Sequence, residues 1–461
     1  MAQSLPPEAE ERVLSTMNRD GTRRWIRPRL SKGVFLKRRR IVGWGLILMF
    51  TLTPYLRMNG KPLILLDIPH REFTLFGTTF LPTDTMFLML LLVGIFVSIF
   101  LMTALFGRVW CGWACPQTVY MELIFRPIEQ LLEGTRAQQL KLDREGPNVR
   151  RLLKFFVYLF VSMFLAHTFL AYFVGVETLF RWVRQSPFEH PAAFVVMTVT
   201  TLLMLLDFGY FREQVCLVAC PYGRFQSVML DRNSAIVGYD YNRGEPRGKR
   251  RKGQSADKLG DCIDCGACVT TCPTGIDIRE GLQMECIGCT QCIDACDAIM
   301  ERIDKPRGLI RYTSQAILET GKRKLVRPRV IAYPLLLVLV FGALGFSLAD
   351  KDSADITVLR GLGNPFVELP SGEISNQIRV KIVNRSGAER DYLIELLDAD
   401  DLRLVAPQNP LPLADRQTET ATLFIITTRA AFQDGVREVV FRVSDGAELS
   451  KEIPYRLLGP Q

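Results

Sequence analysis

Several features that would simplify a functional assignment are missing from this sequence of 461 residues. No cysteine occurs before residue 111 or after residue 296, so all twelve cysteines fall within less than half of the chain. No Gly-x-Gly-x-x-Gly fingerprint follows a predicted strand, which argues against a built-in dinucleotide site. The first forty residues are polar and basic, and they lack the apolar core of a secretory signal peptide.

The positive charge of the chain, formally +9, is unevenly distributed. Lys and Arg number eleven, eight and nineteen in residues 1–40, 107–154 and 212–328, but three and two in residues 57–83 and 176–192. This alternation follows the positive-inside rule for membrane proteins. It predicts that the three basic segments face the cytoplasm, and it disfavours nucleic acid as a partner.

Five apolar runs approach the 17–25 residues that a membrane-spanning helix needs. They are residues 41–56, 86–105, 155–174, 194–211 and 330–349. The first run is short and ends near Pro54, so it is the weakest of the five. With the charge pattern, the runs predict a multi-pass membrane protein, whose residues 350–461 lie outside the cytoplasm.

Eight cysteines form two copies of the spacing C-x2-C-x2-C-x3-C, in "CIDCGACVTTC" (262–272) and "CIGCTQCIDAC" (286–296). Three cysteines at this spacing hold one corner of a [4Fe–4S] cluster, and the fourth reaches the other cluster. We therefore expect one cluster on Cys262, Cys265, Cys268 and Cys296, and the other on Cys286, Cys289, Cys292 and Cys272. A pair of zinc sites fits this repeat less well, because zinc usually takes two ligands from each of two separated knuckles.

The other four cysteines lie in "CGWACP" (111–116) and "CLVACP" (216–221), each just after an apolar run and 105 residues apart. The repeat predicts a duplicated two-helix unit in parallel orientation, which brings Cys111, Cys115, Cys216 and Cys220 together at one membrane face. A proline after cysteine favours a helix start, whose dipole lowers a thiol pKa. Such thiolates suit Cu(I), zinc or an iron–sulfur cluster.

Two other polar residues within the apolar runs are candidate functional residues. His167 lies near the middle of the run 155–174, where a role in function competes with that of a hydrogen-bonded packing residue. Asp207 lies beside the second thiol pair and could relay a proton or bind a cation. An aspartate at this depth could also direct its carboxylate out towards water.

The sequence pattern of residues 350–461 differs from that of the apolar runs and predicts short β-strands. The segments "NQIRVKIVNRS", "RDYLIELLD", "TATLFIITT" and "REVVFRVSD" are separated mostly by residues typical of turns. About seven strands in roughly a hundred residues predict an immunoglobulin-like sandwich. The region contains no cysteine and no catalytic constellation, so we expect a binding or docking module.

The expected fold class is a multi-domain membrane protein with an α-helical transmembrane bundle of five helices. Its parts are a basic tail (1–40), a four-helix region (41–211), a ferredoxin-like domain with two [4Fe–4S] clusters (212–328), a fifth helix (329–349) and the outer sandwich (350–461). The ferredoxin-like domain is expected in the cytoplasm and the sandwich on the opposite side of the membrane.

This order of parts resembles the FixG/CcoG-type cytochrome c oxidase accessory proteins of bacterial inner membranes. Local stretches agree, among them "IRPRLSKGVF" (26–35), "LLDIPHREFTLFG" (65–77), "CGWACPQTVYMELIFRPIE" (111–129) and "NPFVELPSGEISNQIRVKIVN" (364–384). The resemblance covers nearly the whole chain. The second cysteine motif departs from the usual pattern with Asp297 in place of proline, and this change removes no ligand.

The resemblance implies a role in assembling the cbb-type haem–copper oxidase by reducing Cu(II) to Cu(I). Its partners would be copper transporters, a chaperone or an export ATPase, and subunits of that oxidase. The eight cysteines between Cys262 and Cys296 would bind clusters, and the pairs Cys111/Cys115 and Cys216/Cys220 would form the copper-reducing site. Since no nucleotide motif is visible, a separate reductase or another electron donor, which the sequence does not identify, must supply the electrons.

Three other functions remain open on the residues alone. The protein could be a quinol dehydrogenase subunit, with His167 or Asp207 taking the protons of quinol. The four membrane thiols could hold a third iron–sulfur cluster instead of copper. The chain could also be a non-catalytic scaffold, whose sandwich docks oxidase subunits.

Overall fold

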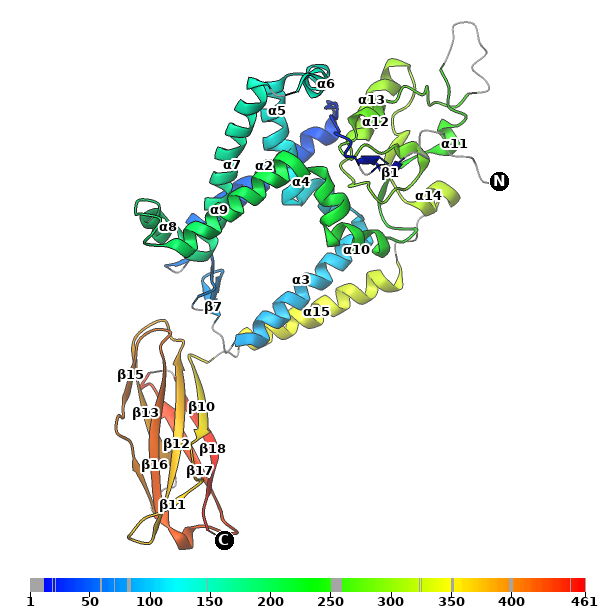
Figure 1. The fold of residues 1–461 in the computed structure, drawn as a ribbon. Helices are drawn as coiled ribbons and strands as arrows, with labels where there is room; N and C mark the ends of the chain where they lie inside the picture. Colours follow the sequence, from blue (N-terminus) through cyan, green and yellow to red (C-terminus); the bar gives the residue numbers. More distant parts are fainter. Residues whose placement is uncertain are drawn as a thin grey trace. The chain divides into compact units, whose positions relative to one another are not determined.

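The computed structural model of the chain divides into two compact units, Met1–Leu344 and Gly345–Gln461 (Figure 1). It describes residues 12–18, 20, 22–58, 60–69, 71–80, 84–146, 148–249, 259–322, 324, 326–349, 352–397, 401–447 and 449–460. The first eleven residues of the basic tail lie outside this description.

Among the described residues of the chain, four helices are long and apolar enough to cross a membrane. They are α3 (Thr85–Phe106), α7 (Val149–Val174), α9 (Pro191–Leu206) with its π-helical extension η5 (Asp207–Phe211), and α15 (Pro328–Ala349). These helices match four of the five predicted spans and indicate a multi-pass membrane protein.

The first predicted span is different. Helix α2 (Val34–Leu52) contains the basic run Lys37 to Arg40 near its start, and the 3-10 turn η1 (Thr53–Tyr55) follows its end. Its continuous apolar part is therefore shorter than the other spans. Figure 1 shows α2 beside α7, and the Tyr172 hydroxyl of α7 donates a hydrogen bond of 2.6 Å to the Phe50 carbonyl oxygen of α2. The crossing of the membrane by α2 remains a prediction.

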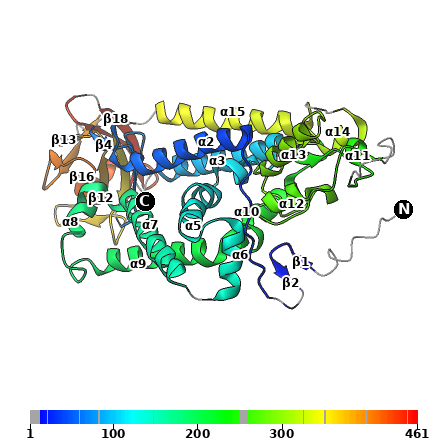
Figure 2. The same ribbon diagram turned by 90° about the horizontal axis from the view of Figure 1, so that it is seen from above.

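Helices α3 and α15 lie side by side in both Figure 1 and Figure 2. The Phe341 ring of α15 lies over Gly94 of α3, where an added Cβ would come within 2.8 Å of it. Phe100 and Tyr333 extend this contact with ring centroids 6.2 Å apart. The last predicted span therefore packs along the second one, although Gly94 and Phe341 are 247 positions apart in the sequence.

Shorter elements connect the spans of the first unit. Its other helices before residue 230 are η3 (Trp110–Ala114), α4 (Pro116–Tyr120), η4 (Met121–Phe125), α5 (Arg126–Glu133), α6 (Arg136–Glu145), α8 (Val176–Trp182), η6 (Val215–Ala219) and α10 (Pro221–Met229). Its strands before α3 are β1 (Arg12–Leu14), β2 (Met17–Asn18), β3 (Arg57–Met58), β4 (Lys61–Pro62), β5 (Ile64–Asp67), β6 (Glu72–Leu75) and β7 (Thr78–Phe80). Strands β5, β6 and β7 form a small antiparallel sheet.

The cysteine-rich part of the first unit folds around a small apolar core. Strands β8 (Ile236–Tyr239) and β9 (Ile310–Thr313) pair antiparallel and enclose the cysteine segment in sequence. Its helices are α11 (Tyr241–Gly244), α12 (Ala267–Thr271), η8 (Ile278–Glu280), α13 (Gln291–Arg302) and α14 (Gln315–Thr320). Val237, Ile293 and Met300 are buried together with several of the cysteines, so the core and the cysteine loops stabilise one another.

The second unit is an antiparallel β-sandwich, as predicted. One sheet has the order β10-β12-β16-β14 with β11 beside β12, and the other has the order β15-β13-β17-β18. The elements are β10 (Ala354–Arg360), β11 (Val367–Glu368), β12 (Glu373–Asn384), β13 (Arg390–Leu397), β14 (Leu402–Val405), β15 (Leu411–Leu413), β16 (Thr418–Thr428), η9 (Arg429–Ala431), β17 (Val436–Ser444) and β18 (Ser450–Leu458). Alternate residues of β12 and β16 are buried, which places one face of each strand in the core.

Candidate iron–sulfur and thiol sites

The two four-cysteine loops share one backbone shape. In each loop, the residues on both sides of the second cysteine have positive φ: Asp264 (51°) and Gly266 (64°), then Gly288 (68°) and Thr290 (64°). Helices α12 and α13 begin directly after Gly266 and Thr290. Such backbone turns direct successive N–H groups to one side, which creates a concave site for an anionic group.

The crossed ligand pattern predicts two groups among the eight thiols of these loops. The first group comprises Cys262, Cys265, Cys268 and Cys296, and the second comprises Cys272, Cys286, Cys289 and Cys292. In the structure, the charges of Cys262 and Cys265 raise the pKa of both Cys268 and Cys296, and the charge of Cys272 raises the pKa of Cys286 and Cys289. Cys268 also raises the pKa of Cys292, so the two groups are neighbours, and the assignment of ligands to each cluster stays a prediction. Burial raises the pKa of Cys286 to about 11 and the pKa of Cys268 and Cys296 to about 12.

A cavity opens at the second group of thiols. Its lining combines cysteines with apolar side chains: Val237, Cys268, Cys272, Thr274, Ile276, Ile278, Cys286, Ile287, Cys289, Thr290 and Cys292. Thiol ligands in an apolar setting suit an iron–sulfur cluster. The residues therefore fit the cofactor that the spacing predicts.

The two C-x3-C-P motifs have the same local structure 105 residues apart. Each follows a membrane helix that ends at a residue with positive φ, namely Gly107 (φ 60°, ψ −128°) and Arg212 (φ 54°, ψ −124°). A π-helical turn, η3 or η6, then carries the first cysteine, and the second cysteine is extended and precedes the proline that starts α4 or α10. This agreement in backbone geometry supports the predicted duplication.

The four thiols of the duplicated motifs lie close enough to affect one another. Burial raises the pKa of Cys216, and the charges of Cys115, Cys111 and Cys220 raise it further. Burial likewise raises the pKa of Cys111 to about 12, and its Sγ donates a hydrogen bond of 3.0 Å to Gln226 Oε1. Topology therefore brings together two thiol pairs that are distant in sequence.

The helix start was predicted to lower the pKa of Cys115, but the pKa of this thiol is raised overall. Burial raises the pKa of this thiol, and the backbone N–H groups of Thr118 and Gln117 lower it by less. The helix start is present, since Pro116 opens α4 directly after Cys115. A protonated thiol must lose its proton before it can bind a metal.

The spacing of the potential ligands limits which kind of metal site they can form. Within the described ranges, no three or more His, Cys, Asp or Glu side chains are arranged to hold one metal ion. A [4Fe–4S] cluster spreads its ligands over four iron atoms, so its thiols lie farther apart than those around a single ion. The four membrane thiols are thus neighbours that do not converge on one point.

The two other candidate residues have different surroundings. The Asp207 carboxylate accepts a hydrogen bond of 2.7 Å from Gln117 Nε2, and its charge raises the pKa of Cys115 and Cys216. It therefore belongs to the surroundings of the thiols. His167 Nδ1 lies 2.8 Å from the Met163 carbonyl oxygen, one turn earlier in α7, which favours the packing role for this histidine.

The first thiol motif packs directly on the second cysteine loop. An added Cβ at Gly112 would lie 2.7 Å from the carbonyl oxygens of both Ile287 and Gly288, so no larger residue fits without displacement. Beside it, Arg108 Nη1 donates a hydrogen bond of 2.8 Å to the Cys286 carbonyl oxygen. The segment that carries Cys111 and Cys115 thus packs on the loop that carries Cys286 and Cys289.

Helix α2 adds a cation to this contact. Arg39 Nε donates a hydrogen bond of 2.6 Å to the Gly112 carbonyl oxygen. Burial raises the pKa of Cys289 to about 12, and the charge of Arg39 opposes that rise. Sequence reasoning missed Arg39, Arg108 and Gln226, because the residues to which they hydrogen-bond, Gly112, Cys286 and Cys111, lie far away in the sequence. The glycine inside "CGWACP", Gly112, was the one sequence signal that another segment packs closely at this position.

Comparison with known proteins places the chain in a family. The model of the immunoglobulin-like fold at the C-terminus of FixG, a putative oxidoreductase, matches residues 344–460. The nitrogen fixation protein FixG of Rhizobium meliloti is 33% identical, over 83% of this chain and 81% of its own length. Protein RdxA of Cereibacter sphaeroides is 37% identical, over 82% and 83%. This chain belongs to the FixG family.

Two further family models cover the cysteine motifs of this FixG-family protein. A 4Fe-4S dicluster domain matches residues 211–315, and a 4Fe-4S binding domain matches residues 87–134. The second match includes Cys111 and Cys115. The putative electron transport protein YccM of Escherichia coli is 28% identical, over 45% of this chain and 53% of its own length. The chain is therefore an iron–sulfur electron-transfer protein with membrane-embedded helices.

A buried group of charges joins the segments that follow the two halves of the duplication in this FixG-family protein. Arg212 forms a double hydrogen bond with Glu129 of α5, at 3.0 and 3.2 Å, and Glu129 also pairs with Arg27 of the N-terminal segment. Burial would raise the pKa of Glu129, but the charges of Arg212, Arg27 and Lys154 outweigh it and hold the pKa at about 2. The carboxylate is therefore ionised at neutral pH, as buried pairing requires.

Proposed function

We propose that this protein carries electrons through two [4Fe–4S] clusters to the four membrane thiols, where Cu(II) is reduced to Cu(I) for assembly of a cbb-type oxidase. The observation that carries the proposal is the contact of Gly112, between Cys111 and Cys115, with the loop at Ile287 and Gly288. This contact gives electrons a short path from the second cluster to the thiols.

Each set of residues has a distinct task in this proposal. The eight cysteines from Cys262 to Cys296 hold the clusters, which supply one-electron transfer when bound. The four membrane thiols provide soft ligands that prefer the Cu(I) product to the Cu(II) substrate. One electron from a reduced cluster converts one Cu(II) to Cu(I), and a separate reductant restores the cluster. Cu(I) then passes to a chaperone or an export ATPase.

Replacement of Cys111, Cys115, Cys216 and Cys220 by serine tests the proposal. The variant is purified anaerobically in detergent beside the wild type, and iron content, EPR after reduction and Cu(II) reduction are measured. We expect about eight iron atoms in both proteins and copper reduction in the wild type alone. Copper reduction at the wild-type rate by the variant would contradict the proposal.

A second variant tests the electron path itself. Gly112→Ala adds a Cβ that the loop at Ile287 and Gly288 cannot accept without moving. We expect its iron content and EPR spectrum to match the wild type, while the rate of Cu(II) reduction falls. Gly45→Ala is a matched control, because an added Cβ at Gly45 of α2 meets no atom within 4 Å.

One observation favours a second candidate for the thiol site. The 4Fe-4S binding domain that matches residues 87–134 includes the first thiol pair, and the four thiols do not converge on one ion. In this alternative, the four cysteines hold a third cluster. The four-serine variant distinguishes the two candidates, since the wild type would then contain about twelve iron atoms and the variant about eight.

We also infer that α2 is a fifth span, with the cysteine-rich part in the cytoplasm and residues 350–461 in the periplasm. Arg27, before α2, pairs with Asp143 between α3 and α7, whereas Arg57, after α2, pairs with Glu177 between α7 and α9. Since α7 separates Asp143 from Glu177, the chain must change sides between residues 27 and 57. The dense Lys and Arg of residues 212–328 favour the cytoplasmic side for the cysteines.

Labelling of single introduced cysteines by a membrane-impermeant maleimide in spheroplasts tests this topology. We expect Met58→Cys and Leu362→Cys to react from outside, because both residues are exposed. Leu131 is more exposed than either residue, but Leu131→Cys should react only after the cells are lysed. Labelling of Leu131→Cys in intact spheroplasts would contradict the topology.

A further inference from the structure

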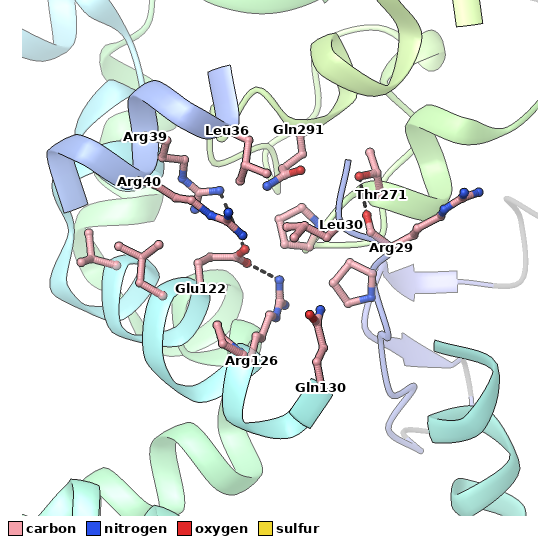
Figure 3. A pocket seen from close by; sticks show the side chains of 15 residues that line it. Arg29, Leu30, Leu36, Arg39, Arg40, Glu122, Arg126, Gln130, Thr271 and Gln291 are labelled. Carbon is pink, nitrogen blue, oxygen red and sulfur yellow. Dashed lines mark hydrogen bonds and ion pairs between the residues drawn. The ribbon is translucent and has the colours of Figure 1, made fainter. Parts of the chain in front are cut away.

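A basic pocket lies between α2, the helical segment α4–η4–α5 and the cysteine-rich part of the first unit. Four arginines and one carboxylate line it, Arg29, Arg39, Arg40, Arg126 and Glu122. Figure 3 shows the guanidinium groups of Arg39, Arg40 and Arg126 gathered around the Glu122 carboxylate, while that of Arg29 points away. The cavity has a volume of about 90 Å³ and opens to the surface.

The arginines of this pocket are not fully neutralised. Arg126 bonds to Glu122 and lies 3.4 Å from Glu213, and Arg39 Nη1 lies 3.9 Å from Glu122. Even with Glu213 included, three guanidinium groups face two carboxylates. Arg39 is 6% exposed and Arg126 is 7% exposed, yet Arg39 Nη2 and Arg126 Nε have no hydrogen-bond partner among the described residues. Buried donors without a partner are costly, so a ligand that accepts from them is favoured.

Several features of the lining specify an oxyanion. The planar guanidinium group presents paired N–H donors that match the oxygens of phosphate or carboxylate. The side-chain amides of Gln130 and Gln291 line the same cavity and can add neutral donors. Phosphate groups have more acceptor oxygens than one carboxylate, so they can satisfy donors that come from different helices.

The position of the pocket along α2 indicates which kind of phosphate-bearing molecule could reach it. Arg40 directly precedes the apolar stretch of α2, which the topology proposed above places in the membrane, so the pocket opens where that helix would enter the lipid. Basic pockets between helices at this level bind the head groups of anionic lipids. We propose that this pocket binds a phosphate-bearing anion and that its natural occupant is the head group of an anionic phospholipid.

The proposal is independent of the copper site and of the third cluster. Native mass spectrometry of the full-length protein, delipidated in detergent, measures the binding of phosphatidylglycerol and of zwitterionic phosphatidylcholine. Arg40→Gln removes an exposed cation of the pocket, and Arg38→Gln removes an exposed cation of the same helix that does not line it. Unchanged iron content in both variants confirms that they fold.

We expect wild type and Arg38→Gln to bind phosphatidylglycerol at least tenfold more tightly than phosphatidylcholine, and Arg40→Gln to lose this preference. A parallel titration with inorganic phosphate separates the two sources of the anion. Tight phosphate binding that Arg40→Gln abolishes, without a lipid preference, would overturn the lipid assignment in favour of a soluble phosphate compound. Equal binding of both lipids without phosphate binding, or equal losses in both variants, would overturn the proposal entirely.

Discussion

Arg212 combines an unfavourable backbone conformation with a buried charge. Its φ of 54° with ψ of −124° is one that side chains other than glycine rarely adopt, and Gly107 has the same conformation in the first half of the duplication. The side chain is 2% exposed and forms its double hydrogen bond with Glu129. Such a backbone conformation costs about 1–3 kcal/mol, and here the buried ion pair offsets that cost.

A pair of substitutions separates the two contributions at Arg212. Both Arg212→Ala and Arg212→Gly lose the pairing with Glu129, but glycine accepts the backbone conformation. We expect both variants to be less stable than the wild type, with the glycine variant more stable than the alanine variant by about 1–3 kcal/mol. Thermal unfolding midpoints in detergent check this order.

Gly107→Ala adds a side chain at the equivalent position in the first half of the duplication. It should be strongly destabilising, because an added Cβ would lie 2.0 Å from the Ala235 carbonyl oxygen. Equal midpoints for the alanine and glycine variants of Arg212 would mean that the backbone relaxes and that position 212 stores no strain.

At the scale of elements, one helix caps another. The N-cap position of α2 is Gly33, which has no side chain to accept hydrogen bonds from the first turn. Asp294 of α13 takes this role instead: its carboxylate accepts hydrogen bonds from the backbone N–H groups of Phe35 (3.1 Å) and Leu36 (2.8 Å). An added Cβ at Gly33 would lie 2.2 Å from the Asp294 carboxylate. Helix α2 is thereby fixed to the cysteine-rich part.

Asp294→Ala should release the start of α2. We expect trypsin to cleave faster at Lys37, Arg38 and Arg40, because loss of an N-cap costs about 1 kcal/mol and frees the first turn. Cleavage rates of the detergent-purified protein check this. Glu301→Ala, an exposed carboxylate on the same helix α13, is the control and should leave the rate unchanged.

The sequence predicted some parts of the candidate site and not others. The cysteine spacing predicts the cluster loops, since a covalent spacing of two or three residues constrains which atoms one cluster can reach. The 105-residue repeat predicts that Cys111, Cys115, Cys216 and Cys220 are neighbours. The contacts of Arg39 with Gly112 and of Gln226 with Cys111 could not be predicted, because no periodicity relates residues 73 and 115 positions apart.

At the scale of the whole molecule, the second unit has a core of its own. Val380, Leu423 and Phe441 are fully buried between the two sheets, and every residue of this core lies between Ala354 and Leu457. No cysteine contributes to it. A core that draws on one continuous segment favours independent folding.

Residues 350–461 expressed alone should therefore fold cooperatively. Within that fragment, Phe441→Ala should lower the free energy of unfolding by about 3–5 kcal/mol, because it leaves a large cavity. Leu393→Ala, at a side chain that is 38% exposed, is the control and should cost much less. Urea unfolding followed by circular dichroism measures both, and a non-cooperative transition of the unsubstituted fragment would show that the unit depends on the rest of the chain.

The sequence by itself determined which segments can enter a membrane, which cysteines share a motif and where the sandwich begins, because hydropathy, spacing and strand alternation are local properties of the chain. Tertiary structure decided which loops meet. It placed Gly112 against the loop at Ile287 and Gly288, Asp294 at the start of α2, and Arg39, Arg40 and Arg126 around one pocket. Such contacts depend on how helices pack, and packing joins residues whose separation in sequence carries no signal.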